Sequence, residues 1–144
     1  MQVLHILKTK PDDAVVTVTP GTSVAQAAKV LADKRIGTVI VSADGERAAG
    51  ILSERDIVRE LGKRGAGVMQ DRVETLMTAD LVTCNRAQTA DDVLTLMTNG
   101  RFRHMPVVEE GKLVGLISLG DVVKARLREL AHENDALQGM IMGH

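Results

Sequence analysis

Apolar residues follow the same helical pattern in both halves of the chain. Each set recurs at positions i, i+3, i+4 and i+7, which is one face of an α-helix. The first set is Val24, Ala27, Ala28 and Leu31, and the second is Ala90, Val93, Leu94 and Met97. Ser23 and Thr89 stand at the expected N-caps, with Gln26 and Asp92 three residues later, as in a capping box. The pattern therefore predicts one amphipathic helix in each half.

Short apolar runs flank both predicted helices. An extended piece precedes each one, at residues 15–18 and 81–84. After each helix come a strand ("GTVIV" or "HMPVV"), a glycine turn ("ADGE" or "EEGK") and a second strand ("AAGIL" or "LVGLI"). Strand, glycine turn and strand predict a β-hairpin. A second helix follows, from Glu54 in one half and from Leu119 in the other, so each half is a β-α-β-β-α unit.

The two units are copies of one sequence. Residues 15–41 align with 81–107 without a gap, and "GILSERDIV" at 50–58 returns as "GLISLGDVV" at 115–123. A weaker match precedes each copy, "VLHILK" and "VETLMT". One unit alone would bury little surface, so we expect the copies to pack through their sheets and share one core.

The predicted fold class is therefore α/β (α+β), with two repeats arranged as a pseudo-twofold sandwich. An N-terminal helical segment is expected before the first repeat and a C-terminal helical tail after the second. The boundaries we infer are residues 1–66 for the first repeat with its N-terminal segment, 67–130 for the second repeat and 131–144 for the tail.

Composition narrows the classes of function. The chain has 144 residues, a net charge of −1 and one aromatic residue, Phe102. Neither a basic surface nor stacking residues for nucleic acid are expected. There is no membrane-length apolar run, no signal-peptide pattern and a single cysteine, Cys84, so we expect a cytoplasmic protein bound neither to membrane nor to nucleic acid.

The repeated Ser-x-x-Asp has two interpretations. It is a helix-capping signature, so Ser53 and Ser118 can simply begin the following helices. The same geometry can bind a nucleoside phosphate. A helix N-terminus attracts phosphate, a serine hydroxyl can bond a phosphate oxygen, and a carboxylate one turn later can accept hydrogen bonds from a ribose diol.

The order of these motifs resembles a known family. "VVTVTPGTSVAQAAKVL", "RFRHMPVV" and "GLISLGDVV" resemble the repeats of a tandem CBS (cystathionine-β-synthase-like) domain pair, or Bateman module, over residues 3–130. The resemblance implies a stand-alone regulatory module that binds an adenosyl ligand: AMP, ADP, ATP, NAD or S-adenosylmethionine. AMP is the ligand we expect first, with NAD and ATP as alternatives, and no cofactor is required.

The resemblance also implies two clefts, each taking groups from both repeats. One nucleotide-binding cleft would be formed by Thr17, Thr19, Ile36, Gly37, Thr38, Leu116, Ser118 and Asp121. The other would be formed by Thr83, Asn85, Phe102, Arg103, His104, Met105, Ile51, Ser53, Arg55 and Asp56.

The two clefts differ in charge. Arg55, Arg103 and His104 make the second cleft rich in cations, whereas Gly37, Thr38 and Gly120 stand at the equivalent places of the first, without charge. Charge-assisted hydrogen bonds to phosphate are roughly twice as strong as neutral ones. We therefore predict that the cleft with Arg103 binds phosphate more tightly and fills first.

Other candidate sites are weaker. The four histidines and Cys84 lack metal-ligand spacing, and Cys84 is expected to be a small buried apolar residue. No catalytic triad or P-loop pattern occurs, and "GKRGAG" at 62–67 is interpreted as a flexible linker between the copies.

The tail carries a coiled-coil pattern. Its positions are spaced 4, 3, 4, 3 and 4 along the chain: Val123, Leu127, Leu130, Asn134, Leu137 and Ile141. This seam can pack on its own chain or on a second copy. A homodimer with an unidentified protein effector is expected. The rival hypotheses are a structural homodimeric module with non-functional clefts and a nucleotide-processing enzyme.

Overall fold

The computed structural model describes residues 1–10 and 15–141 of the chain. Residues 11–14 of the predicted first repeat and 142–144 of the predicted tail lie outside the described residues. The helices are α1 (Val3–Thr9), α2 (Val24–Lys34), α3 (Glu54–Arg64), α4 (Ala90–Gly100) and α5 (Leu119–Ile141), with 3₁₀ turns η1 (Ala66–Gln70) and η2 (Val73–Thr75). The strands are β1 (Thr17–Val18), β2 (Thr38–Val41), β3 (Gly50–Ser53), β4 (His104–Glu109) and β5 (Lys112–Ser118). No helix within the described ranges is both long and apolar enough to cross a membrane.

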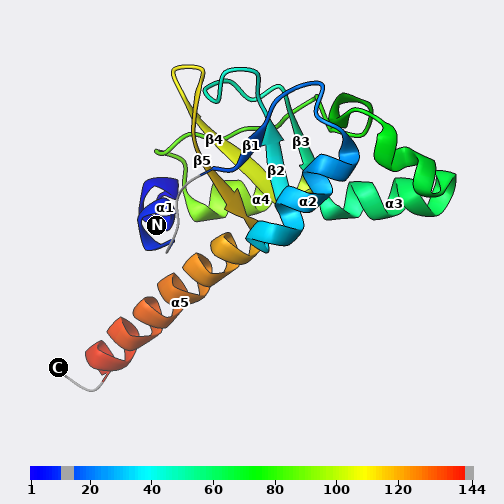
Figure 1. Ribbon diagram of the computed structural model, residues 1–144. Coiled ribbons are helices and arrows are strands. Elements are labelled where there is room, and N and C mark those ends of the chain that lie inside the picture. Colours follow the sequence, from blue (N-terminus) through cyan, green and yellow to red (C-terminus); the bar gives the residue numbers. More distant parts are fainter. Residues whose placement is uncertain (11–14, 142–144) are drawn as a thin grey trace.

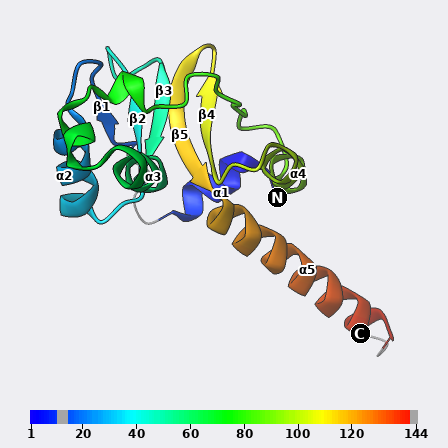
Figure 2. The ribbon, with the colours of Figure 1, turned by 90° about the vertical axis from the view of Figure 1, so that its right-hand side faces the viewer.

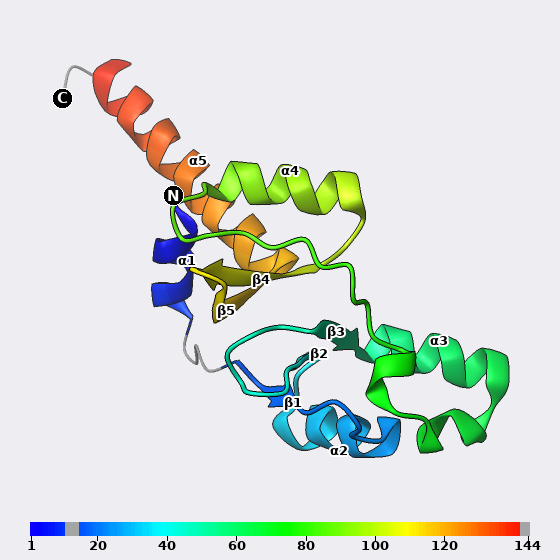
Figure 3. The same cartoon turned by 90° about the horizontal axis from the view of Figure 1, so that it is seen from above.

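Each repeat folds into a small sheet with helices on one side. In the first repeat the strand order is β1-β2-β3, with β1 parallel and β3 antiparallel to β2. In the second repeat β4 and β5 form an antiparallel hairpin, and Cys84 alone pairs with β4 where a strand over 81–84 was expected. Seen from above, the two sheets face one another and α2, α3, α4 and α5 lie outside them (Figure 3). This is the predicted sandwich.

Local sequence explains why the helices begin where they do. Ser23 accepts a hydrogen bond from the Gln26 backbone N–H at 3.1 Å, and Thr89 forms a full capping box with Asp92. The turn between β4 and β5 has positive φ at Glu110 and Gly111, 51° and 79°, which is the type I′ geometry that matches the twist of a hairpin.

The segment that precedes each repeat packs on the other repeat. In Figure 2, α1 lies beside β5 and α4 rather than beside β1 to β3. The Val3 backbone N–H donates to the Gln88 carbonyl at 2.8 Å, and the Val73 backbone N–H donates to the Thr22 carbonyl, also at 2.8 Å. The chain therefore crosses between the two halves twice, in pseudo-symmetric fashion.

The buried apolar residues form two clusters, whereas one shared core was expected. The cluster of the second repeat includes Val3 and Ile6 from α1, and the cluster of the first repeat includes Val68, Val73 and Leu76. Each sheet is too small to cover its own helices, and the crossing segments supply the missing apolar surface. Each core is therefore completed by side chains from the segment that precedes the other repeat.

One sequence interpretation is wrong. Residues 62–67 are not a flexible linker, because α3 continues to Arg64 and η1 begins at Ala66. Gly65, with φ of 75°, ends the helix in a conformation that glycine tolerates. Arg64 contacts Glu60 at 3.1 Å and Asp71 at 2.7 Å, and buried Val68 anchors the following turn.

Cys84 lies where the sequence analysis placed it, in the apolar interior. Its side chain is 4% exposed, and burial raises the pKa of the thiol to about 12. The thiol is therefore protonated at neutral pH and packs as a small apolar group.

Candidate functional site

The two repeated Ser-x-x-Asp motifs begin α3 and α5 as capping boxes. Ser53 donates its backbone N–H to Asp56 Oδ2 at 2.9 Å, and its hydroxyl accepts from the Asp56 N–H at 3.2 Å. Ser118 and Asp121 repeat these contacts at 2.9 and 3.1 Å. Both motifs therefore place a hydroxyl and a carboxylate at a helix N-terminus, where the local potential is positive.

Strand register brings both motifs to the surface between the two sheets. Thr38 lies opposite Ser53 on neighbouring strands, and His104 lies opposite Ser118. Thr38 Oγ1 lies 3.2 Å from His104 Nδ1, so the equivalent strands of the two repeats meet there through a polar contact. Two hollows open on either side of this contact, and both share Gly37, Thr38 and His104.

The first hollow, called the Arg103 cleft here, has a volume of about 450 Å³. Such a volume suits a small organic ligand. The lining consists of Gly37, Thr38, Ile51, Ser53, Glu54, Arg55, Asp56, Arg59, Thr78, Arg101, Phe102, Arg103 and His104. Four of these side chains are arginines and two are carboxylates, so the cleft carries an excess of positive charge at the N-terminus of α3.

The second hollow, called the Lys10 cleft here, has a volume of about 470 Å³. Its lining consists of Lys10, Val15, Val16, Lys34, Ile36, Gly37, Thr38, His104, Leu116 and Ser118. The sequence places uncharged residues where the Arg103 cleft has cations, but Lys10 and Lys34 line this cleft and supply positive charge that was not predicted. Lys10 lies at the end of the segment that crosses to the second repeat, so alignment of the two copies does not reveal it.

Lys10 binds Asp121, the carboxylate that was predicted for this cleft. Its Nζ donates to the Leu116 carbonyl at 2.7 Å and lies 3.0 Å from Asp121 Oδ2. Burial alone would raise the pKa of the Asp121 carboxyl, but hydrogen bonds from Ser118 and Lys10 hold that pKa below its ordinary value. A ligand that uses Asp121 must therefore displace or share Lys10.

The equivalent carboxylate of the Arg103 cleft is held more loosely. Asp56 Oδ1 accepts from Arg59 Nη2 at 2.8 Å, on the same helix, and the Arg59 side chain is 55% exposed. An exposed pair of this kind contributes only about 0.3–0.5 kcal/mol. Asp56 Oδ1 can therefore change partner at little cost, while Oδ2 stays bonded to Ser53.

His104 lies between the two clefts and is surrounded by charged groups. Burial is the main reason that its pKa is lowered, Lys10 and Arg103 lower it further, and Asp121 and Glu54 oppose them. The imidazole is therefore mainly neutral at pH 7. The neutral ring can donate or accept a hydrogen bond with Thr38 and adds no charge to either cleft.

The structure brings twelve of the eighteen predicted site residues to the lining of a cleft. They are Ile36, Gly37, Thr38, Leu116, Ser118, Phe102, Arg103, His104, Ile51, Ser53, Arg55 and Asp56. The other six lie outside the two linings: Thr17, Thr19, Thr83, Asn85, Met105 and Asp121.

The six remaining residues have other contacts or positions. Thr19 Oγ1 lies 3.3 Å from Thr22 Oγ1, and Asn85 Oδ1 accepts from the Ala87 N–H at 3.0 Å. Met105 is fully buried in the core of the second repeat. Thr17 belongs to β1, Thr83 is exposed between secondary-structure elements, and Asp121 reaches the Lys10 cleft only through Ser118 and Lys10.

Sequence reasoning missed several lining residues. Arg59 stands one helical turn after Asp56, and Arg101 stands two residues before Arg103, so a search for basic residues near the motif would have found both. Lys34 sits near the end of α2, next to the strand that forms the cleft. Lys10 has no comparable signal in the sequence.

Comparison with protein families gives an independent identification of the repeats. The model of the CBS domain matches this chain twice, over residues 6–63 and 73–128. These two matches cover most of the chain and correspond to the two copies found in the sequence.

Solved structures and curated relatives agree with this match. The CBS-domain protein ATU1752 from Agrobacterium tumefaciens is 45% identical, with a TM-score of 0.82 over 88% of this chain and 99% of that one. The mitochondrial CBS domain-containing protein CBSX3 of Arabidopsis thaliana is 32% identical over 84% of this chain, which spans 61% of that protein. The CBS domain pair of MJ0100, described in complex with 5′-methylthioadenosine and S-adenosyl-L-methionine, is 22% identical, with a TM-score of 0.77 over 90% of this chain and 98% of that one.

Proposed function

The chain belongs to the CBS-domain family, and from that premise we propose that it is a regulatory module that binds an adenine nucleotide in the Arg103 cleft. The observation that carries this proposal is the convergence of the Ser53–Asp56 helix cap with arginines from both repeats on one cleft. The adenosyl ligands described for MJ0100, which has the same fold, support the choice of ligand class.

Each group of the Arg103 cleft has a distinct role in this proposal. The Ser53 hydroxyl and the N-terminus of α3 face the phosphate, with Arg55 and Arg103 supplying charge-assisted hydrogen bonds. Asp56 releases Arg59 and accepts the ribose diol. Ile51 and Phe102 offer the apolar surface against which the base packs.

We expect AMP in this cleft before the other adenosyl ligands, and we expect the Arg103 cleft to fill before the Lys10 cleft. In the Lys10 cleft the carboxylate is already bound to Lys10, and fewer cations are available for phosphate. In the Arg103 cleft the cation that binds the carboxylate is exposed Arg59, which contacts Asp56 Oδ1, while Oδ2 is bonded to Ser53. Binding is proposed to alter the relative position of the repeats, which a protein effector or a second copy would detect. A ligand produces such a shift only when it prefers one arrangement.

Calorimetric titration of Arg103→Ala with AMP tests the proposal. A lost charge-assisted bond is worth about 1.5–3 kcal/mol, so AMP affinity should fall roughly tenfold or more, while adenosine affinity should stay unchanged. Arg47→Ala is the matched control, because Arg47 is an exposed arginine that lines neither cleft. Equal AMP affinity in Arg103→Ala and the unaltered protein would contradict the assignment of the phosphate to this cleft.

One observation favours a second candidate, a structural module with non-functional clefts. In both Ser-x-x-Asp motifs the serine and aspartate bond to each other, so the motif is explained by capping alone. A thermal-shift panel of AMP, ATP, NAD and S-adenosylmethionine separates the two. A ligand at a hundred times its Kd stabilises the folded state by about 2.7 kcal/mol, whereas an unchanged melting temperature throughout would favour the structural module. The nucleotide-processing alternative predicts product after incubation with ATP or NAD, and our proposal predicts none.

A further inference from the structure

Helix α5 is longer than the repeat requires. It runs without interruption from Leu119 to Ile141, so the final helix of the second repeat and the predicted tail are one element. Its beginning packs on the body through buried Val122 and Ala125. Figure 1 shows its later turns projecting away from both sheets.

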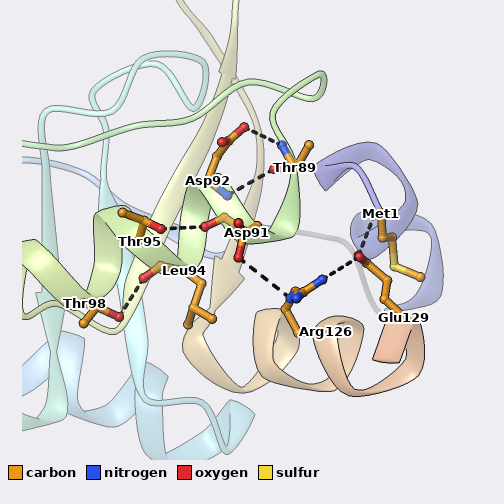
Figure 4. A network of polar contacts seen from close by, with 9 residues as sticks. All are labelled: Met1, Thr89, Asp91, Asp92, Leu94, Thr95, Thr98, Arg126 and Glu129. Carbon is orange, nitrogen blue, oxygen red and sulfur yellow. Dashed lines mark hydrogen bonds and ion pairs between the residues drawn. The ribbon is translucent and has the colours of Figure 1, made fainter. Parts of the chain in front are cut away.

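Polar contacts at the beginning of α5 fix the direction in which it projects. Arg126 lies between Asp91 of α4, at 3.8 Å, and Glu129, at 2.9 Å (Figure 4). Beyond Leu130 the helix extends for about 16 Å at 1.5 Å per residue. This part of the helix forms no long-range polar contact among those described for residues 1–10 and 15–141.

The projecting helix carries an exposed apolar row, called the α5 seam here. It consists of Val123, Leu127, Leu130, Asn134, Leu137 and Ile141. The apolar members are between 40% and 84% exposed, with Leu127 at 61% and Leu137 at 57%. The earlier alternative, that this row packs on its own chain, is therefore wrong for the described residues.

The order of residues in the seam indicates what covers it. Leu130 and Leu137 occupy heptad position d, and Leu127, Asn134 and Ile141 occupy position a. Leucine at d with a single asparagine at a is the pattern that favours a parallel pair of helices in one register. In that register each Asn134 faces the Asn134 of the other copy and the two amides can bond.

An antiparallel arrangement of the two α5 helices fits the seam less well than the parallel one. An antiparallel pair of α5 seams would oppose Asn134 to Leu130, leaving an amide against an apolar side chain. It would also bring Glu133 of one copy close to Glu133 of the other. In the parallel pair, the flanking positions place Arg126 opposite Ala131 and Glu133 opposite Gln138, without like charges.

The charges on the rest of α5 argue against a membrane surface as the occupant. Lys124, Arg126 and Arg128 are balanced by Glu129, Glu133 and Asp135. Interfacial helices that bind anionic lipid carry a face rich in lysine and arginine. A seam that is complementary to itself, on a helix with a net charge of only −1, favours a second copy of the same chain.

We propose that the exposed α5 seam pairs with the same seam of a second copy as a parallel, in-register two-stranded coiled coil. This interface is independent of the nucleotide clefts. The protein would then have a mass of twice 15.5 kDa in solution.

Sedimentation equilibrium of seam variants tests the interface. The double variant Leu130→Glu, Leu137→Glu should dissociate, with a dimer Kd raised roughly a hundredfold or more, because each buried leucine contributes about 1.5–3 kcal/mol. The matched control is His132→Glu, Ala136→Glu, which adds the same two negative charges to the same helix outside the seam. All four side chains are exposed, with Leu130 at 48%, so the circular dichroism spectra of the variants should be unchanged.

A cysteine at the end of the seam tests the orientation. In the parallel pair, Ile141→Cys brings two thiols to the same layer, and a disulfide-linked dimer should form on mild oxidation. In the antiparallel pair these thiols would be about 27 Å apart and would not link. Buried Cys84 does not interfere. A monomeric protein, or a dimer unaffected by the glutamate variants, overturns the interface, and a dimer that fails to cross-link overturns its parallel orientation.

Discussion

Gly50 and Gly115, the first residues of the repeated phrase, leave room for the two segments that cross between the repeats. A Cβ added at Gly50 would overlap the Met77 side chain, and one added at Gly115 would lie 2.7 Å from Leu7 Cδ2. Met77 and Leu7 hold matching positions in the segments that precede the two repeats. The glycines therefore admit the crossing segments, and their recurrence is explained by packing.

Gly115→Ala should destabilise the protein by about 1–3 kcal/mol, because the new methyl group overpacks a filled site. Urea unfolding followed by circular dichroism measures the change. Gly120→Ala is the control, since an added Cβ there meets only Ser118 Oγ at 3.7 Å. Leu7→Ala, which makes room, should reduce the effect of Gly115→Ala in the double variant. Strict additivity would show that Leu7 is not the cause.

His104 should make stability depend on pH. Its folded-state pKa is lowered by burial and by Lys10 and Arg103, against Asp121 and Glu54, so the unfolded chain binds the proton more readily. Stability is then fully present above the unfolded value of about 6.5 and falls as pH decreases below it. His104→Gln can keep a hydrogen bond to Thr38 and should lose less melting temperature between pH 7.5 and 5.5. Equal losses would exclude His104 as the origin.

The helices and strands of this protein were predictable because each is encoded locally. A period of 3.6 with a cap residue identifies α2 and α4, and alternation around a glycine turn identifies β4 and β5. The segment at 62–67 was not predictable, because three glycines indicate a loop. Its order depends on the ion pair of Arg64 with Asp71 and on burial of Val68, neither of which the glycine pattern reveals.

The residues of the candidate site also differ in whether the sequence could predict them. Ser53 and Asp56 were found because the repeated phrase marks them in the sequence, and Arg103 was assigned through the resemblance of the motif that contains it. Lys10 was not found, because its place beside Asp121 follows from where α1 packs. Thr19 and Asn85 were included by resemblance, and both have short-range contacts that keep them in turns.

At the scale of the whole molecule, the crossing segments join two apolar clusters into one structure. Ile6 lies in the cluster of the second repeat and Leu76 in that of the first, although each stands before the opposite repeat in the sequence. Neither half can lose its core without releasing a segment of the other. We therefore expect the two repeats to unfold together.

The single cysteine offers a way to observe this coupling. Cys84 is buried in the cluster of the second repeat, so its labelling by a thiol reagent reports unfolding of that half. Leu76→Ala removes apolar contacts only from the first cluster, where Leu76 is 8% exposed, and should destabilise the protein by about 2–5 kcal/mol. If the halves are coupled, the urea midpoint of Cys84 labelling shifts as far as the midpoint measured by circular dichroism. Ile6→Ala, in the cluster of Cys84 itself, is the positive control. A Cys84 midpoint that Leu76→Ala leaves unchanged would mean that the two repeats unfold independently, despite the crossing of the chain.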